Sequence, residues 1–503
     1  MRRGKKPYKM YGVDTARAPY GYRGVSSFSA DASQIGLKIL EYGGNALDAF
    51  IAVQIALEIF EPGWTGFGGG GFTLIHHLNT EEALFIDYRE TAPRETCLED
   101  ALDQWSRGGP CLVGVPGLAA GIEELYDLKG VGIEPVFRPE ELINRVVELV
   151  MRLIKPPSIL LIRSLEIYES AKEKLETYSP RYFESIMKSY ETGRPIDISN
   201  YVSFIKALGR DGWGDMYHGK TADKLLRSFD HLGIPIDRDD LEGYSVEYRR
   251  PIYFELDGIE YVSSPPPGGG AALKMLLHSM LESFESPYEY VEKLRETHIY
   301  REGIEDPRTG CGETAHITIY DGEAIVLSTT TLECFMGSGI YLDDLGILLN
   351  DELHDFNISG SRNRVAPCRR PRSSMSPTIA YLDGSILGLG ASGGTRIITA
   401  LATTLYQRIY RGINLQQAIE EARLHYEVRG EAYLYEPDPY IDRYIRVASR
   451  KGYILIDAPK NYPSPFKEDR SIQMGDVEAV EVVSRGAYFA SDPRKGYGAL
   501  TTS

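Results

Sequence analysis

The chain has 503 residues, with 72 acidic against 55 basic side chains and a formal net charge of −17. A chain of this length can bury a large core, and so negative a charge argues against nucleic acid as a partner. The most apolar stretch, Val146 to Leu165, is interrupted by Glu148, Arg152 and Pro156, so we expect no membrane span.

The N-terminus and the cysteines bear on the compartment. The basic residues of segment 1–10 are not followed by the apolar stretch of a signal peptide, which predicts a cytoplasmic location. The five cysteines are odd in number and contain no C-x-x-C pair, so we expect no disulfide framework. The nine histidines contain no H-E-x-x-H motif, and we therefore predict neither a metal site nor a cofactor.

The N-terminal part predicts helices followed by strands. A helical pattern covers 32–60 and is interrupted before Asn45, which suits an N-cap. Residues 66–71 fit G-x-G-x-x-G, but a helix precedes them and a strand follows, which is the reverse of the dinucleotide-binding order. We interpret these glycines as sites of close backbone packing. Strands are expected at 72–77 and 83–88, with Arg89 just past the second.

The middle of the chain is mostly helical in pattern. Residues 112–126 lead into a helix, and 130–210 are rich in Lys and Glu, which suggests a helical elaboration on the surface. Three prolines and three glycines at 265–270 precede another helical pattern at 271–281. We expect a turn into a buried helix there rather than a flexible linker.

Residues 314–331 predict a β-hairpin. Two alternating strands flank Asp321-Gly322, a strong hairpin turn signal. If those two residues form the loop, Thr314 lies opposite Thr329, and Thr331 and Glu333 share its face. Taken alone, the stretch favours an ordinary threonine-rich strand at a sheet surface, since Thr is a good strand former.

Several motifs around this hairpin resemble one family. In chain order the C-terminal half contains E-T-A-H, T-L-E, G-I-L-L-N-D-E-L-H-D-F, R-S-S-M-S-P-T-I and A-S-G-G-T-R-I. Upstream are G-G-N-A-L-D-A, E-P-G-W-T-G-F-G-G-G-G-F, D-Y-R-E-T-A-P and V-G-V-P-G-L-A-A-G. Together they resemble the γ-glutamyltranspeptidases, which are N-terminal-nucleophile hydrolases. The resemblance covers most of 24–497 and is weakest in 130–210.

The resemblance implies a fold and a maturation step. The fold would be α+β, a four-layer αββα sandwich with two antiparallel sheets between helices. Self-cleavage before Thr314 would give a large chain, 1–313, and a small chain, 314–503. The two chains would share one core and remain associated.

The resemblance also implies an activity. Thr314 would attack the γ-glutamyl amide of glutathione-like donors and pass the acyl group to water or an amino acid. A threonine hydroxyl needs a base, and the new α-amine can serve. Thr331 matches the residue that supports the nucleophile, and Gly393 and Gly394 match the oxyanion donors.

The substrate's charged groups would be recognised by a second set of matching residues. Arg89 matches the clamp for the α-carboxylate, with Ser373 and Ser374 sharing that task. Glu333, Glu352 and Asp355 match the residues around the α-ammonium.

Three departures from the family leave alternatives open. Two of the ammonium-site residues, Glu333 and Glu352, stand where many members have Asn and Gln, although a Bacillus-like subset also has Glu. Ala315 replaces a hydroxyl residue, and 356–372 is short for a lid, so we expect an open pocket. The alternatives are a related acylase on other γ-linked or glutaryl amides, and an unprocessed, inactive binding protein with the same fold.

Overall fold

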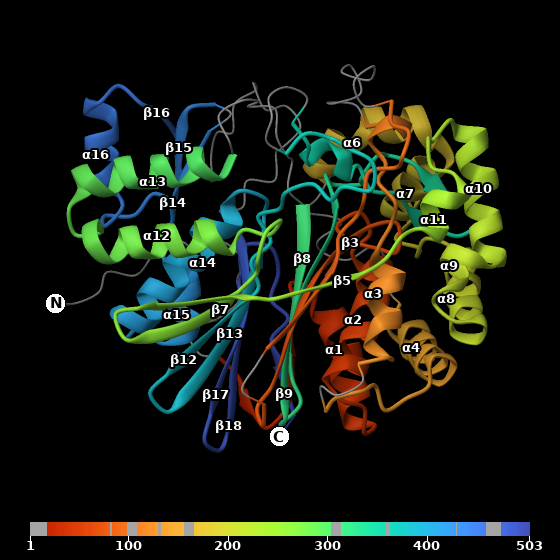
Figure 1. The fold of residues 1–503 in the computed structure, drawn as a ribbon, viewed down its shortest axis with the longest axis horizontal. Helices are drawn as coiled ribbons and strands as arrows, with labels where there is room; N and C mark the ends of the chain where they lie inside the picture. The colour runs from red at the N-terminus through yellow and green to blue at the C-terminus, as the bar shows by residue number, and fades with distance from the viewer. Residues whose placement is uncertain are drawn as a thin grey trace.

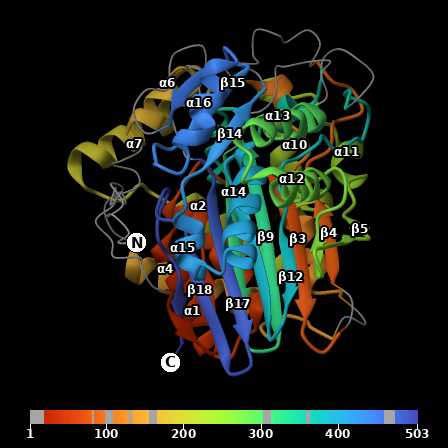
Figure 2. The same cartoon turned by 90° about the vertical axis from the view of Figure 1, so that its left-hand side faces the viewer.

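The computed structural model describes residues 18–80, 83–97, 108–128, 132–154, 165–302, 313–357, 363–428, 430–458 and 474–502. Two seven-stranded sheets face each other, and a layer of helices covers the outer face of each (Figure 1). The turned view shows the strands of both sheets running in the same general direction behind the helices (Figure 2). The predicted four-layer α+β sandwich is therefore confirmed.

The first sheet carries the predicted nucleophile. All its pairings are antiparallel, and it combines segments from before and after residue 313. Its strands in spatial order are β19 (Leu500–Thr501), β2 (Gly24–Ser26), β8 (Glu313–Tyr320), β9 (Ala324–Glu333), β3 (Gly70–His77), β4 (Leu84–Tyr88) and β5 (Glu247–Arg249).

The second sheet is also antiparallel, and its outer strands come from the N-terminal part of the chain. Its strands in spatial order are β1 (Tyr20–Gly21), β18 (Gly486–Ser491), β17 (Asp476–Val483), β13 (Ser385–Ser392), β12 (Thr378–Leu382), β7 (Ile259–Ser263) and β6 (Ile252–Leu256). Both sheets therefore need strands from each side of the predicted cleavage point.

The helices form the two outer layers. The layer on the first sheet contains α1 (Ala30–Glu41), α2 (Ala46–Phe60), α3 (Leu118–Leu125), α4 (Pro139–Leu153) and α8 (Ser199–Asp211). The layer on the second contains α12 (Gly270–Ser283), α13 (Pro287–Glu302), α14 (Arg396–Leu405), α15 (Leu415–Glu420) and α16 (Asp442–Arg450). None of the helices in the described ranges has the length and hydropathy that a membrane span requires.

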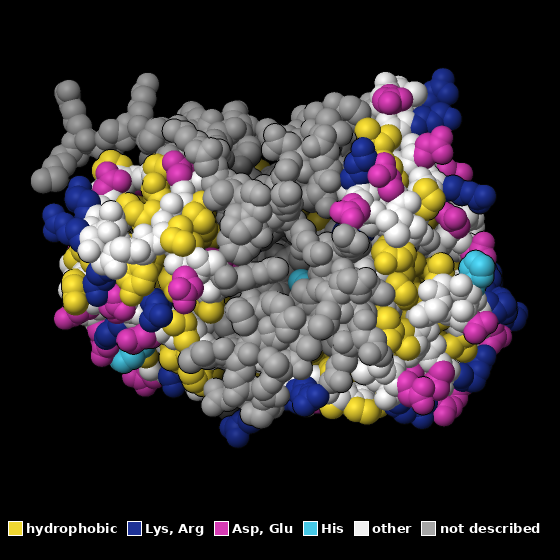
Figure 3. Space-filling view, turned by 90° about the horizontal axis from the view of Figure 1, so that it is seen from above, with side chains coloured by type: hydrophobic (Ala, Val, Ile, Leu, Met, Phe, Trp, Pro, Cys, Tyr) yellow, Lys and Arg dark blue, Asp and Glu magenta, His cyan; other side chains and the backbone are white. Residues whose placement is uncertain are grey.

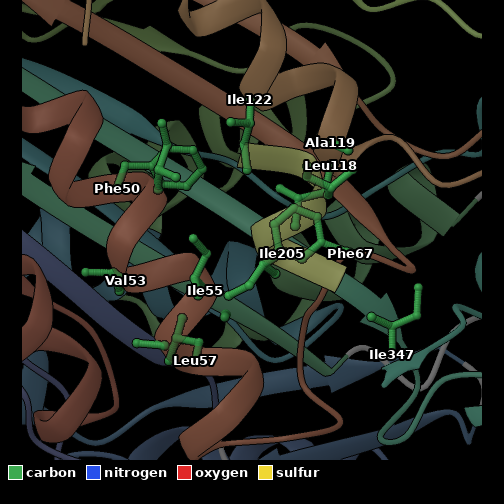
Figure 4. Close-up of a cluster of buried hydrophobic side chains, with 14 of the residues drawn as sticks. Phe50, Val53, Ile55, Leu57, Phe67, Leu118, Ala119, Ile122, Ile205 and Ile347 are labelled. Atoms are coloured by element: carbon green, nitrogen blue, oxygen red, sulfur yellow. The ribbon is translucent and has the colours of Figure 1, made fainter. Parts of the chain in front are cut away.

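The buried apolar side chains form one large cluster under each helix layer. Helix α2 is apolar on nearly every side, and Asn45 begins it with a capping box, as predicted. Its side chains pack with those of α3 and α8 (Figure 4). The helical region 130–210 is thus partly core, because Phe204 and Ile205 of α8 are buried. Seen from above, the two flanks mix acidic and basic side chains (Figure 3).

The hairpin forms as predicted, but its register differs. Thr314 pairs with Thr331 rather than Thr329, because the loop is one residue further along. The Asp321 carboxylate accepts hydrogen bonds from the amides of Glu323 and Ala324 and from Ala46 at the start of α2. Asp321 therefore flanks the two-residue loop and stabilises it, and is not itself a loop residue.

One expectation from the cysteines is wrong. Cys97 and Cys111 form a disulfide, with their Cα atoms 5.2 Å apart. An odd cysteine count excludes complete pairing but not a single bridge, so the count was too weak a guide. The G-x-G-x-x-G segment is packed as interpreted, because a Cβ on Gly68 or Gly69 would lie about 2 Å from a backbone oxygen of the neighbouring chain segment.

Candidate active site

Thr314 and Thr331 lie directly opposite each other on neighbouring strands. The register shifts between Glu313 and Thr314, so an irregularity stands at the predicted cleavage point. Thr331 is held on its other side by Gly70 of β3, and its hydroxyl accepts a hydrogen bond of 2.8 Å from the amide of Glu333. This local geometry places two threonine side chains on one face of the hairpin, as the sequence predicted.

The face of β8 that carries Thr314 points toward the second sheet. Two positions along, His316 is fully buried, and burial lowers its pKa to about 3. Its ring would lie about 2 Å from a Cβ on Gly390 of β13, so that glycine allows the two sheets to approach. The neutral imidazole forms a hydrogen bond of 2.8 Å between its Nδ1 and the Thr329 hydroxyl. We interpret His316 as a structural residue next to Thr314.

A buried lysine contacts the backbone of Thr314, the predicted nucleophile. Lys495 Nζ donates a hydrogen bond of 2.7 Å to the carbonyl oxygen of Thr314 and another of 3.3 Å to the Ser392 hydroxyl. The ammonium lies 3.6 Å from the ring centroid of Trp64 and 4.1 Å from that of Phe28. These contacts hold a cation within a few ångströms of the Thr314 backbone.

The predicted oxyanion donors lie in the turn between β13 and α14. Gly393 and Gly394 have φ of 115° and 57°, a conformation that favours glycine. Their carbonyls accept from the amides of Arg396 and Ile397 at the start of α14. Among the described residues no backbone carbonyl accepts the amide protons of the two glycines, so both can donate to a ligand.

Arg89 is fully buried among carboxylates. Its Nη2 lies 2.5 Å from both Glu352 Oε1 and Asp355 Oδ2 and donates to the Arg372 carbonyl. Burial alone would lower the pKa of Arg89, but Glu352 and Asp355 more than offset it and raise the pKa. Nε donates to the Pro371 carbonyl at 2.9 Å, which ties Arg89 to the segment leading to Ser373.

The three predicted ammonium-site carboxylates converge. Oxygens of Glu333, Glu352 and Asp355 lie within 4.8 Å of one another. Burial, more than repulsion from neighbouring carboxylates, raises the pKa of Glu352 well above its usual range. Burial is also the main reason that the pKa of Glu90 rises to about 8. Three such carboxylates could suit a metal ion, but the Arg89 guanidinium already supplies positive charge to two of them.

One pocket brings most of the predicted residues together. Gly393 lies next to the lining in sequence, whereas Glu352 is fully buried behind Arg89 and does not line the pocket. The lining comprises Arg89, Arg301, Thr314, Thr331, Glu333, Asp355, Ser373, Ser374, Met375, Gly394, Thr395 and Ile397.

Sequence reasoning missed four lining residues. Met375 and Thr395 lie beside motif residues that the sequence did single out, and Ile397 follows in the first turn of α14. Arg301 is the last-turn arginine of α13, and such a residue ordinarily indicates a solvated helix end. Lys495 belongs to the closing S-D-P-R-K-G segment, but nothing in its spacing pointed to Thr314.

Comparison with known proteins gives the same assignment. The family profile described as gamma-glutamyltranspeptidase matches residues 32–305 and 300–502. A glutathione hydrolase proenzyme of Bacillus subtilis is 29% identical over 509 residues, covering 84% of this chain and 83% of that protein. One from Escherichia coli is 27% identical, with 97% and 93% covered. A cephalosporin acylase structure from Bacillus halodurans shares the fold, at 17% identity, complete coverage of both chains and a TM-score of 0.77. The chain therefore belongs to the γ-glutamyltranspeptidase family.

Proposed function

We propose that this protein cleaves γ-glutamyl amides of glutathione-like donors through an acyl-threonine intermediate and passes the acyl group to water or an amino acid. The observation that carries the proposal is the single pocket that joins Thr314 to Arg89, Ser373 and Asp355. A nucleophile, a guanidinium and carboxylates in one pocket match the carbonyl, carboxylate and ammonium of a γ-glutamyl group.

Maturation comes first in the proposed sequence. The Thr314 hydroxyl attacks the Glu313 carbonyl, the peptide nitrogen leaves as the new α-amine, and water opens the resulting ester. The large chain, 1–313, and the small chain, 314–503, remain together because both sheets contain strands of each. A free α-amine has a pKa of about 7.7–8.0, so a useful fraction is neutral near pH 7.

Turnover uses the same hydroxyl. The neutral α-amine takes the Thr314 proton while Oγ bonds the γ-carbonyl carbon, and the ammonium then protonates the leaving amine. The amides of Gly393 and Gly394 stabilise the oxyanion of each tetrahedral intermediate. Thr331 supports the nucleophile from the opposite strand. In deacylation, the α-amine takes a proton from water or from an acceptor amino acid as it attacks the ester, and the resulting ammonium returns a proton to Thr314 Oγ as it leaves.

Substrate recognition is divided between two faces. Arg89 with Ser373 and Ser374 takes the α-carboxylate, and Glu333 with Asp355 takes the α-ammonium. Since Arg89 already contacts Glu352 and Asp355, the donor carboxylate competes for a partly neutralised guanidinium. Glu352 contacts Arg89 and does not line the pocket, so it contributes to the ammonium site indirectly, through Arg89.

The alternatives fit less well. A glutaryl group has no ammonium, so its binding would leave Glu333 and Asp355 without the cation that their position suits. An inactive binding protein would stay uncleaved. The cytoplasmic location remains a prediction, and the Cys97–Cys111 disulfide weighs against it because such bonds are rare in the cytosol.

One gel and one pair of substrates test the proposal. Purified protein should resolve into two bands under denaturing conditions, and N-terminal sequencing of the smaller should begin at Thr314. Thr314→Ala should stay full length, whereas Thr314→Ser should still mature. The mature protein should hydrolyse γ-glutamyl p-nitroanilide with a higher kcat/KM than glutaryl p-nitroanilide. An uncleaved wild-type chain, or preference for the glutaryl substrate, would overturn the proposal.

A further inference from the structure

The pocket contains a second arginine that the reaction described above does not use. Arg301 lines it together with Thr314, Thr395 and Ile397. It stands in the last turn of α13, a sixteen-residue helix whose C-terminal end points toward the centre of the molecule (Figure 1). A cation at a helix C-terminus is favourably placed in the field of the helix.

The position of α13 is fixed one turn before Arg301. His298 Nε2 and Thr399 Oγ1 of α14 are 3.1 Å apart, and the same hydroxyl lies 2.9 Å from His425 Nδ1. The two imidazole rings are packed edge to face, with centroids 4.4 Å apart. Because residues three apart share a helix face, this contact directs Arg301 toward the N-terminal end of α14.

The two arginines stand at different parts of the pocket. Arg89 lies among Glu352 and Asp355, on the part assigned to the glutamyl group. Arg301 lines the pocket beside Thr395 and Ile397, which directly follow the oxyanion glycines in the chain. An acyl group held at Arg89 with its carbonyl at Thr314 must direct its leaving amine away from Arg89. Arg301, Thr395 and Ile397 line the pocket beyond the oxyanion glycines, and we place that amine against them.

We propose that Arg301 forms a second carboxylate subsite, which binds the carboxylate of the leaving amino acid or peptide. The preferred donors are then γ-glutamyl amides whose leaving group is itself an α-amino acid or a short peptide. By microscopic reversibility an acceptor amino acid places its own carboxylate at the same arginine. This inference rests on the proposed γ-glutamyl activity and adds a specificity for the leaving group.

Two donors that differ in one charge test the subsite. γ-Glutamyl-L-alanine and γ-glutamyl-L-alaninamide share the acyl group, and glutamate release reports turnover of both. Wild type should favour the free acid, and Arg301→Met should lower kcat/KM for it by roughly 10- to 100-fold, as expected for one charge-assisted contact. The loss for the amide should stay below about twofold. Arg301→Lys should recover part of the loss, since it keeps the charge.

Arg295→Met is the matched control on the same helix. Arg295 lies over the rings of Tyr426 and Tyr453, at 5.7 and 6.0 Å, and does not line the pocket, so both donors should be unaffected. Comparing the two donors in one preparation removes any effect of a partly folded variant. Equal losses on both donors, or no loss with Arg301→Met, would overturn the subsite and leave γ-glutamyl activity standing. Failure of wild type to use either donor would instead overturn the proposed function, and this inference with it.

Discussion

Replacing Lys495 with Met tests whether a buried cation prepares the nucleophile. Nζ is 2.7 Å from the Thr314 carbonyl oxygen, and standard backbone geometry puts it about 5 Å from the α-amine that cleavage creates. At that separation, with an effective dielectric constant of about 20–40, the two groups interact by roughly 1.5–3 kcal/mol. The cation disfavours the protonated amine, so it keeps the base neutral at lower pH.

The expected result is a displaced pH profile rather than an unfolded protein. Removing the cation should move the acidic limb of kcat/KM upward by roughly one to two pH units. Met fills a similar volume, but the buried Asp476 carboxylate loses the cation that lowers its pKa. We therefore expect Tm to fall by a few degrees while the protein stays folded.

The assay is γ-glutamyl p-nitroanilide hydrolysis between pH 5 and pH 10, with a gel to quantify self-cleavage. Lys451→Met is the matched control, because Lys451 also lies over an aromatic ring, that of Tyr288, but is far from Thr314 in sequence and outside the pocket lining. Superimposable acidic limbs for wild type and Lys495→Met would refute the electrostatic role. A large fall in Tm with an unshifted limb would make the lysine a purely structural residue.

Three further substitutions have defined outcomes. Arg89→Lys keeps the charge but loses the planar fork, so KM for a γ-glutamyl donor should rise roughly 10- to 100-fold while self-cleavage changes little; an unchanged KM would exclude Arg89 as the clamp. Glu352→Gln removes a carboxylate from Arg89, so KM should fall most at high pH, where the parent is ionised, and identical KM profiles would contradict that. Burial raises the pKa of Glu58 to about 8, so the folded state holds a proton that the unfolded state loses above about pH 4.5, and stability should fall as pH rises toward 8. Glu58→Gln keeps an acceptor for the Phe67 amide and should flatten that loss, measured by urea unfolding in a Thr314→Ala background between pH 5 and 9.

The sequence predicted those features that local pattern or motif can encode. The capped helix after Asn45, the hairpin around Asp321-Gly322 and the strand ending before Arg89 each depend on neighbouring residues. The hairpin register was missed by two positions because Asp321 is held by Ala46, some 275 residues away in the chain. A turn signal read locally contains no such long-range contact.

The unpredicted part of the site depends on tertiary placement. Glu352 and Asp355 are three residues apart and were assigned together, yet only Asp355 reaches the pocket while Glu352 lies behind Arg89. Arg301 ends the helix that precedes the hairpin and Lys495 lies near the C-terminus, and a lone basic residue normally indicates a solvated surface. Their roles depend on which helix end or sheet edge the fold brings to Thr314.

Both sheets combine N-terminal with C-terminal strands, and this fixes the order in which folding and the proposed cleavage can occur. Strands β8 and β9 lie between β2 and β3, so neither fragment alone contains a complete sheet. Folding must precede the cut, and the cut then turns a unimolecular refolding reaction into a bimolecular one. Recovery of native protein after urea should be independent of concentration for Thr314→Ala but should fall on dilution for the cleaved protein. Under the proposed cleavage, the peptide bond before Thr314 is a tether needed only while the two halves assemble. Once it is cut, the mature protein depends on its two chains remaining associated.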